Sequence, residues 1–304
     1  MKANAFQLVL TAILIVHCPV ESNATIARAG FSMPDSLHEV TFLYRGLKNL
    51  IILPVTINDS VNVNLILDTG CRNLVLFGRH FNKFFNLLAD KKVQFSGLGS
   101  GKPVIGRLAL NNKVSIDAVI GQSIPIVIIP DQKLFASHQN IDGIIGYDIF
   151  IKFEVELNCA QQRITFRPAI EAEISPAYEK IAIRVEDGRP VMNSTVSIDN
   201  KSISFDLMID TGSSLGLLLK TTDLSRFRST MGSRSVLGRG LNGNLEGTSI
   251  VADRLFLDHL EIENVTTGII YSPWHNYASV GMDLLAGYCL VLNYCKSYAG
   301  FKKA

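Results

Sequence analysis

The sequence has little charge, and positive and negative residues nearly balance. Charged residues make up 18% of the 304-residue chain, and the formal net charge at pH 7 is +2. There is no basic stripe along the sequence, so nucleic acid is not an expected partner. With 47% hydrophobic residues, the composition is typical of a globular chain rather than a disordered one.

Metal-binding patterns are missing as well. The chain has 6 histidines and 5 cysteines, and none of them stands at the spacing of a zinc site. We therefore expect no metal and no other cofactor. Of the four cysteines outside the N-terminal segment, Cys71 is expected to pack as a small buried thiol. Cys159 could form a disulfide with Cys289 or Cys295 if the protein is exported.

Long apolar runs are scarce, and the most prominent one lies at the N-terminus. Residues 5–16 form an apolar run after Lys2, and small-residue cleavage sites follow it. This layout predicts a signal peptide over residues 1–24, because the run is too short for a membrane span. We expect export as a soluble periplasmic or secreted protein. An uncleaved anchor is the alternative, and the bulky His17 argues against lipid attachment at Cys18.

The most informative feature that is present is a duplicated tripeptide. Asp-Thr-Gly occurs at residues 68–70 and again at residues 210–212. Each copy predicts a carboxylate on a tight turn between two buried strands. The flanking apolar runs are residues 62–67 and 71–77 in the first copy, and 204–209 and 213–219 in the second.

A second pattern extends the repeat. Residues 146–158 align without a gap on residues 281–293, with Gly, Asp and Asn in matching positions. The first pattern repeats after 142 positions and the second after 135, which indicates one shortened loop within a shared unit. Chance similarity between two strand-turn patterns is the alternative. A chain of this length has room for two domains, and we place them at residues 25–172 and 173–304.

The remaining sequence indicates an all-β fold. Alternating apolar residues and polar turns recur along both halves. Helix is expected only in short pieces and in one turn after each late glycine. The expected strands include residues 53–57, 114–120, 195–198 and 260–265, and the expected helices are residues 77–89 and 222–227.

These motifs together resemble those of the aspartic peptidases of the pepsin and retropepsin group. The resemblance is carried by residues 68–70, 144–146, 210–214 and 279–281, and it covers about residues 40–304. The closest likeness is to bacterial retropepsin-like proteins with both lobes on one chain. It implies two β-barrel lobes related by a pseudo-twofold axis, with each late glycine supporting one Asp-Thr-Gly turn.

The chemistry that the resemblance implies needs Asp68 and Asp210 to act as a pair. Two carboxylates within hydrogen-bonding distance cannot both ionise, so they share one proton. The ionised member activates a water molecule, and the protonated member donates to the peptide carbonyl. By resemblance, the hydroxyls of Thr69 and Thr211 bond across to the opposite lobe. The residues expected to support the pair are Thr69, Gly70, Thr211, Gly212 and Ser213.

A glycine-rich hairpin in each lobe is the candidate for a flap over the substrate. Glycines would let such a hairpin flex and pair with an extended peptide, although ordinary surface hairpins look the same. The counterpart in the second half is residues 237–247. Lacking a tyrosine, the first hairpin departs from pepsin and points toward the retropepsin-like branch. The expected flap residues are Phe95, Ser96, Gly97, Leu98 and Gly99.

Two features compete with this interpretation. Gly238, Gly240 and Gly243 fit a dinucleotide-binding pattern, but no amphipathic helix is expected to follow them, so we do not predict a nucleotide site. Cys71 stands where the family usually has Ser, Thr or Ala, and we expect it to pack rather than to react.

The sequence therefore predicts an aspartic endopeptidase that acts on peptides or proteins. It is expected to work as a monomer, because one chain supplies both aspartates. A catalytically inactive member of the same fold that binds peptides or proteins is the alternative. The two aspartates cannot be assigned as acid and base from the sequence.

Overall fold

The computed structural model describes most of the chain after residue 28. The described residues are 29–95, 99, 101–130, 140–223, 227, 233–272 and 277–304. Several predictions lie outside them: the signal peptide, the lipid site at Cys18, flap residues Ser96, Gly97 and Leu98, and residues 224–226 of the helix expected at 222–227.

The predicted all-β class is confirmed. Among the described residues, strands hold 63% and helices 6%, in three short helices. These helices are η1 (Arg79–Phe84), α1 (Tyr147–Phe150) and α2 (Met282–Leu285). The helices α1 and α2 are the turns expected after the two late glycines.

The first large sheet contains nine strands of the described chain. Their order is β1-β9-β6-β10-β5-β4-β8-β7, with β3 beside β4 and a further pairing of β9 with β8. Most of these strands are apolar on the side that is buried, which drives their packing. The strands are β1 (Gly30–Ser32), β3 (Arg45–Leu47), β4 (Leu50–Ile57), β5 (Val61–Leu67), β6 (Leu74–Phe77), β7 (Leu87–Phe95), β8 (Val104–Ile116), β9 (Val119–Ile129) and β10 (Gly143–Ile145).

The second large sheet repeats the first with eight described strands. Its order is β14-β15-β16-β21-β17-β20-β19-β18, with a further pairing of β15 with β19. Apart from β1, each strand of the first sheet has a counterpart in the same place. The strands are β14 (Arg184–Glu186), β15 (Arg189–Ile198), β16 (Lys201–Asp210), β17 (Leu217–Thr221), β18 (Ser235–Gly240), β19 (Gly243–Leu257), β20 (Leu260–Tyr271) and β21 (Ala278–Gly281).

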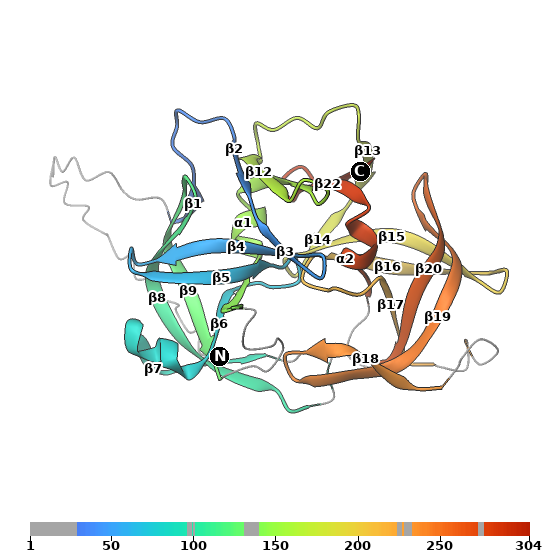
Figure 1. Cartoon of the computed structure of the whole chain (residues 1–304), viewed down its shortest axis with the longest axis horizontal. Helices are drawn as coiled ribbons and strands as arrows, with labels where there is room; N and C mark the ends of the chain where they lie inside the picture. The colour runs from blue at the N-terminus through green and yellow to red at the C-terminus, as the bar shows by residue number, and fades with distance from the viewer. Residues whose placement is uncertain are drawn as a thin grey trace, which may run out of the picture.

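A third sheet joins the two halves. It has six described strands in the order β13-β23-β22-β11-β12-β2, so that each half contributes three. In Figure 1 the first half lies on the left in blue and green, the second half on the right in yellow to red, and the shared strands cross the top. The strands are β2 (Val40–Leu43), β11 (Phe153–Asn158), β12 (Arg163–Pro168), β13 (Glu179–Ala182), β22 (Tyr288–Asn293) and β23 (Tyr298–Lys303).

The pairing register at the centre of this sheet shows the twofold relation. Val155 pairs with Leu292 and Leu157 pairs with Leu290 across β11 and β22. The repeat offset of 135 residues relates Val155 to Leu290 and Leu157 to Leu292. The offset therefore converts one pair into the other with the two strands exchanged, as a twofold axis between β11 and β22 requires. The two halves are therefore two lobes related by pseudo-twofold symmetry, as expected from the repeat.

A buried polar network ties the lobes together beneath this axis. Glu154 of β11 is buried and accepts hydrogen bonds from Tyr298 Oη and from Asn293 Nδ2, both in the second lobe. Arg167 Nη1 lies 3.5 Å from the other carboxylate oxygen of Glu154. A buried charge needs such partners, so removing one would leave a costly unpaired group.

Two local predictions were wrong. Residues 77–89 do not form one helix, because β6 continues to Phe77, η1 is a short 3-10 helix, and β7 begins at Leu87. Residues 114–120 do not form one strand. Asp117 adopts a left-handed conformation with φ of 50°, which turns the chain from β8 into β9. At residues 114–120 the alternating apolar pattern continues across the turn and hides it.

The boundary between the lobes stays a prediction. Strand β12 ends at Pro168 and β13 begins at Glu179. In the part of the chain that the structure describes, there is no helix of the length and hydrophobicity needed to cross a membrane.

Candidate active site

Both Asp-Thr-Gly turns are held by a late glycine that no other residue could replace. The backbone N–H of Asp68 donates to the carbonyl of Ile145 at 2.8 Å. A Cβ on Gly146 would lie 1.9 Å from the carbonyl oxygen of Asp68, and one on Gly281 would lie 2.4 Å from that of Leu215. Each late glycine is therefore required for close packing against the segment that carries its aspartate.

The two turns are joined to each other by four hydrogen bonds through the two threonines. Thr69 N donates to Thr211 Oγ1 and Thr211 N donates to Thr69 Oγ1, both at 3.0 Å. The hydroxyl of Thr69 donates to the carbonyl of Ile209 at 2.6 Å, and that of Thr211 to the carbonyl of Leu67 at 2.8 Å. Both threonines are fully buried. These bonds fix one turn against the other.

As a result, the two aspartates approach the same point. A Cβ on Gly70 would lie 3.0 Å from Asp68 Oδ1 and 3.8 Å from Asp210 Oδ1. A Cβ on Gly212 would lie 2.2 Å from the carboxyl carbon of Asp68, so the second turn packs directly on the first aspartate. Both glycines also donate a backbone hydrogen bond to the aspartate of their own turn, at 2.7 Å for Asp68 and 3.2 Å for Asp210.

The surroundings raise the pKa of both aspartates. Burial and the charge of Asp210 raise the pKa of Asp68 to about 7, against opposing contributions from the N–H of Gly70 and from Arg189. Burial also raises the pKa of Asp210, and the charge of Lys220 is the strongest influence in the other direction. Two carboxylates in this position hold one proton between them over a range of pH.

Two basic residues near the pair were not identified from the sequence. Arg189 begins β15, and its charge acts on both Asp68 and Asp210. Lys220 lies in β17 and is only 8% exposed. Burial lowers the pKa of Lys220 to about 8, although Asp210 acts to raise it. One signal was available, since a lysine directly after the apolar Leu217–Leu219 is unusual in a buried strand.

Arg189 also belongs to an ion-pair chain that crosses between the lobes. Its Nη1 lies 3.0 Å from Asp187 Oδ2, and Arg72 Nη1 of the first lobe lies 2.5 Å from Asp187 Oδ1. Arg72 and Asp187 are both more than half exposed, so this chain contributes little stability by itself. The ion pairs show that the hairpin of β14 and β15 lies against the segment that follows the first turn.

A tyrosine from the shared sheet lies next to the pair. Tyr294 follows β22 and stacks on Phe150 of α1 with ring centroids 5.2 Å apart. Its hydroxyl is buried and has no hydrogen-bond partner among the described residues. Burial, with the charges of Asp68 and Asp210, raises the pKa of Tyr294 well above the ordinary value. A buried hydroxyl of this kind usually bonds to an ordered water molecule.

The glycine-rich hairpins of the two lobes meet at their tips. Gly101 N donates to the carbonyl of Asn242 at 2.6 Å, and Gly99 N donates to Asn242 Oδ1 at 2.8 Å. Asn242 Nδ2 in turn donates to the carbonyl of Gly101 at 3.2 Å. Phe95 ends β7 at the base of the first hairpin. The contact between the two predicted hairpins was not expected from the sequence.

The second hairpin also packs on the segment that follows Asp210. Leu218, Leu245 and Ile270 form a small apolar cluster, with Leu215 and Leu237 packed against it. Leu215 comes five residues after Asp210, and Leu237 belongs to β18. The hairpin is therefore held on the same side of the second lobe as the aspartate.

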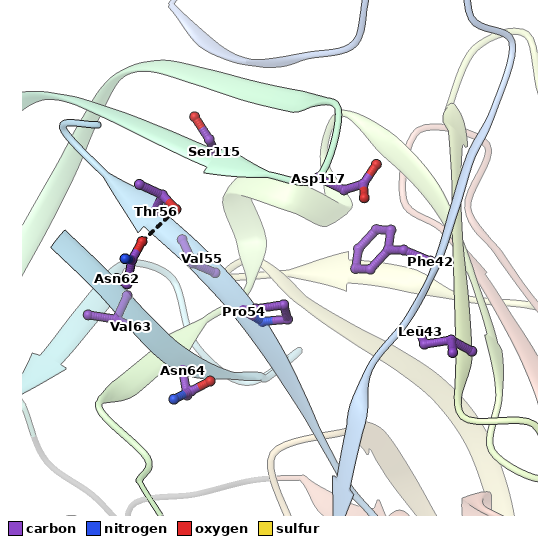
Figure 2. A pocket seen from close by; sticks show the side chains of 10 residues that line it. All are labelled: Phe42, Leu43, Pro54, Val55, Thr56, Asn62, Val63, Asn64, Ser115 and Asp117. Carbon is purple, nitrogen blue, oxygen red and sulfur yellow. Dashed lines mark hydrogen bonds between the residues drawn. The ribbon is translucent and has the colours of Figure 1, made fainter. Parts of the chain in front are cut away.

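Two surface hollows lie elsewhere and contain none of the predicted site residues. One, of about 500 Å³, lies between β2 and the hairpin of β4 and β5, where Thr56 donates to Asn62 at 2.9 Å (Figure 2). The other, of about 570 Å³, is lined by Asn193–Thr195 and Ser204–Asp206 and occupies the matching place in the second lobe. Because the pseudo-twofold axis relates them, both hollows follow from the shared architecture.

The four cysteines within the described residues are free thiols. A disulfide between Cys159 and Cys289 or Cys295 is therefore not formed. Cys71 is buried, and its thiol donates to the carbonyl of Asn73 at 2.9 Å. Cys295 lies in the turn after β22.

The glycines of the dinucleotide-like pattern lie in a different setting from a nucleotide site. Gly238 and Gly240 belong to β18, and Gly243 begins β19. A strand follows them instead of a helix, so no helix N-terminus is available for a phosphate.

A two-lobed all-β fold in which paired Asp-Thr-Gly turns meet at the lobe interface has the architecture of the acid proteases. The comparisons agree with this class. Residues 53–149 match a family model described as aspartyl protease, so this part of the chain is similar to that family. The matched segment includes the first turn and Gly146. Among curated proteins, no match was found.

Proposed function

We propose that the protein is an aspartic endopeptidase that hydrolyses peptide bonds with a water molecule activated by Asp68 and Asp210. The proposal rests above all on the reciprocal hydrogen bonds between Thr69 and Thr211, which hold two acidic turns face to face. The match of residues 53–149 to aspartyl proteases supports it. A structural β-protein would have no need for two acidic side chains aimed at one point.

The chemistry follows from the shared proton. The ionised aspartate takes a proton from the water as the water oxygen bonds to the peptide carbonyl carbon. The protonated aspartate donates its proton to the carbonyl oxygen. When the C–N bond of the tetrahedral intermediate breaks, the aspartate that took the proton of the water gives it to the leaving nitrogen. The other aspartate takes a proton from a hydroxyl of the intermediate, whose carbon becomes that of the carboxylic acid product. Each aspartate thus acts once as acid and once as base, and the pair ends in its starting state.

The substrate would be an extended peptide segment between the turns and the two hairpins. Backbone N–H and C=O groups of a hairpin can pair with a peptide strand regardless of its sequence. Since the hairpin tips are bonded to each other, they would have to separate before a chain could enter. Unfolded segments or exposed loops are therefore the expected substrates.

We further propose that the protein acts as a monomer after export. Both aspartates come from one chain, so dimerisation would not be needed to build the site. Specific activity that rises with protein concentration would contradict the monomeric site. Removal of the proposed signal peptide can be checked by N-terminal sequencing of protein recovered outside the cytoplasm.

The decisive experiment is digestion of a denatured protein mixture by the purified protein between pH 4 and pH 8. Mass spectrometry would identify the cleaved bonds. Asp68→Asn and Asp210→Asn are the matched variants, because each keeps the shape of the side chain and removes its ability to exchange a proton. We expect each substitution to lower kcat/KM by at least about a hundredfold, the range for removing a general acid or base.

Two outcomes would contradict the proposal. Cleavage that survives either substitution would show that the aspartates do not act as a pair. Saturable binding of peptides without cleavage at any pH would instead favour the peptide-binding alternative.

A further inference from the structure

The two lobes differ in the residues that stand next to each aspartate. In the first lobe Leu47 pairs with Leu50 across β3 and β4, and in the second Glu186 pairs with Arg189 across β14 and β15. Strand β4 precedes Asp68 in the same way as β15 precedes Asp210. Arg189 is therefore the counterpart of Leu50.

A second basic residue replaces an apolar one on the other side. In the first lobe Phe77 pairs with Ile129 across β6 and β9. In the second, Lys220 pairs with Ile270 across β17 and β20. The counterpart of Phe77 is thus Lys220, with one extra residue between Asp210 and β17.

Both basic residues lie on the sheet face that carries Asp210. Val191 pairs with Met208 across β15 and β16, and residues two positions apart in a strand point to the same face. Arg189 is two residues before Val191, and Asp210 is two residues after Met208. All four side chains therefore share one face, which we call the dyad face of the second lobe.

Lys220 lies on this dyad face as well. Leu218 and Met208 both pair with Ser279, one from each side of β21, so they point to the same face. Lys220 is two residues beyond Leu218. The dyad face is turned toward the first lobe, because Met208 Cε lies 3.7 Å from a Cβ built on Gly70. A buried cation on this face adds to the positive potential around Asp210.

From this placement we infer that Arg189 and Lys220 hold the negative charge of the pair on Asp210 and leave the proton on Asp68. The inference rests on the proposed function, and it assigns the roles within it. Asp210 is the base that takes the proton of the attacking water, and Asp68 is the acid that protonates the carbonyl oxygen. Arg189 and Lys220 are positioning residues, since they act through Asp210.

Arg189 lowers the pKa of both aspartates and is paired with Asp187, so the difference between the two aspartates comes mainly from Lys220, the strongest influence that lowers the pKa of Asp210. The other ionisable groups around the pair do not reverse this assignment. On the first-lobe side are the thiol of Cys71 and, beyond it, Asp148 of α1, whose pKa burial raises to about 6. Tyr294, which follows the shared strand β22, is neutral at physiological pH as tyrosines ordinarily are, and burial raises its pKa further. None of these three groups is a cation. The pKa of Asp68, raised to about 7, agrees with a proton held there in mild acid.

The test replaces the two basic residues of the second lobe by the residue types found at the equivalent positions of the first lobe. In the double variant Arg189→Leu with Lys220→Phe, the charge on Asp210 loses both cations, so its pKa rises. We expect the acidic limb of the kcat/KM profile to move upward by about one pH unit, because one nearby opposite charge shifts a carboxyl pKa by that order. At pH values below that limb, kcat/KM of the double variant should be about tenfold lower than that of the wild type. Arg189→Lys with Lys220→Arg keeps both charges and should leave the limb in place.

A matched control in the first lobe separates charge from packing. Leu50→Met changes a residue at the place equivalent to Arg189 without changing the charge, and it should not move the acidic limb. An unchanged limb in the folded Arg189→Leu, Lys220→Phe protein would overturn the inference. A limb that moves equally in Leu50→Met would do the same.

A second measurement does not depend on activity. At pH 6 Asp68→Asn resembles the resting state, with a neutral side chain at position 68. Because asparagine needs no proton to be neutral, the melting temperature of this variant should equal or exceed that of the wild type. Asp210→Asn deprives two cations of their partner, so we expect it to melt at least about 4 °C lower. The reverse order, or an equal loss, would overturn the assignment. If the wild type cleaves no peptide, the proposed function fails, and the melting order still tests where the charge resides.

Discussion

The first and second lobes have the same strand order but different side chains around their aspartates. Sheet order, the hairpins, the late glycines and the threonine bonds recur in both. Several side chains near the turns have diverged, such as Cys71 in the first lobe and Ser213 in the second. The two lobes thus share the backbone geometry that brings the aspartates together, whereas they differ in the charged side chains around the pair.

This difference has a consequence for the chemistry. Two identical carboxylates in identical surroundings would share the proton equally. Unequal surroundings assign the proton to one side before any substrate arrives. The symmetric part of the molecule therefore brings the aspartates together, and the asymmetric part decides which of them is ionised.

The largest expected effect comes from the symmetric part. Thr69→Val keeps the shape of the side chain but leaves the carbonyl of Ile209 and the N–H of Thr211 without partners in a fully buried place. Each unpaired group costs about 1–3 kcal/mol. For these two groups together we expect the free energy of unfolding to fall by about 2–6 kcal/mol, measured by urea denaturation, and cleavage to be lost.

The comparison between lobes sharpens this prediction. Thr211→Val should cost about as much as Thr69→Val, because the two threonines make equivalent bonds. Thr69→Ser retains the hydroxyl and is the control, with most of the stability preserved. A loss confined to one lobe would show that the two turns are not energetically equivalent.

The next effect is the dependence of protein stability on pH that follows from the raised pKa of Asp68. The pKa of Asp68 is about 7 in the folded protein and about 3.9 in an unfolded chain. Because the folded state binds the proton more tightly, its contribution to stability is complete below about pH 3.9. That contribution is lost as the pH rises to about 7, with a slope of at most about 1.4 kcal/mol per pH unit.

This slope can be measured by urea unfolding at pH 5 and pH 8. The wild type should lose more stability between the two values than Asp68→Asn, which has no proton to release at that position. Cleavage should also decline as the pH rises through about 7, because the pair then has no proton to donate. Equal losses of stability in the two proteins would contradict the raised pKa of Asp68.

Much of this architecture could be predicted from the sequence, for a physical reason. A tight turn between two buried strands leaves a local signature, and Asp68 and Asp210 carry it in both copies. The turn at Asp117 was missed because the apolar alternation of β8 continues into β9 without a break. Local pattern alone cannot reveal a turn when both flanking strands bury the same face.

The electrostatic surroundings could not be predicted in the same way. Arg189 lies 21 residues before Asp210 and meets it only because β15 and β16 form a hairpin. The contact of Asn242 with Gly99 and Gly101 depends on how the two lobes are oriented. Such relations arise from tertiary packing, which spacing along one chain does not encode.

The smallest predicted effect tests the contact between the two hairpins. Gly101 of the first hairpin and Gly240 of the second differ in how closely their neighbours approach. A Cβ on Gly101 would lie 2.0 Å from the carbonyl oxygen of Asn242, whereas one on Gly240 would meet its nearest neighbour at 3.7 Å. Gly101→Ala should therefore separate the tips, speed amide hydrogen exchange at residue 101 and lower kcat/KM by about tenfold, equal to about 1.4 kcal/mol. Gly240→Ala should leave both quantities nearly unchanged, because an ordinary van der Waals contact accommodates a methyl group.

The exchange rate does not depend on catalysis. Unaltered exchange in Gly101→Ala would therefore mean that the tips are not held together in solution, whatever the activity shows.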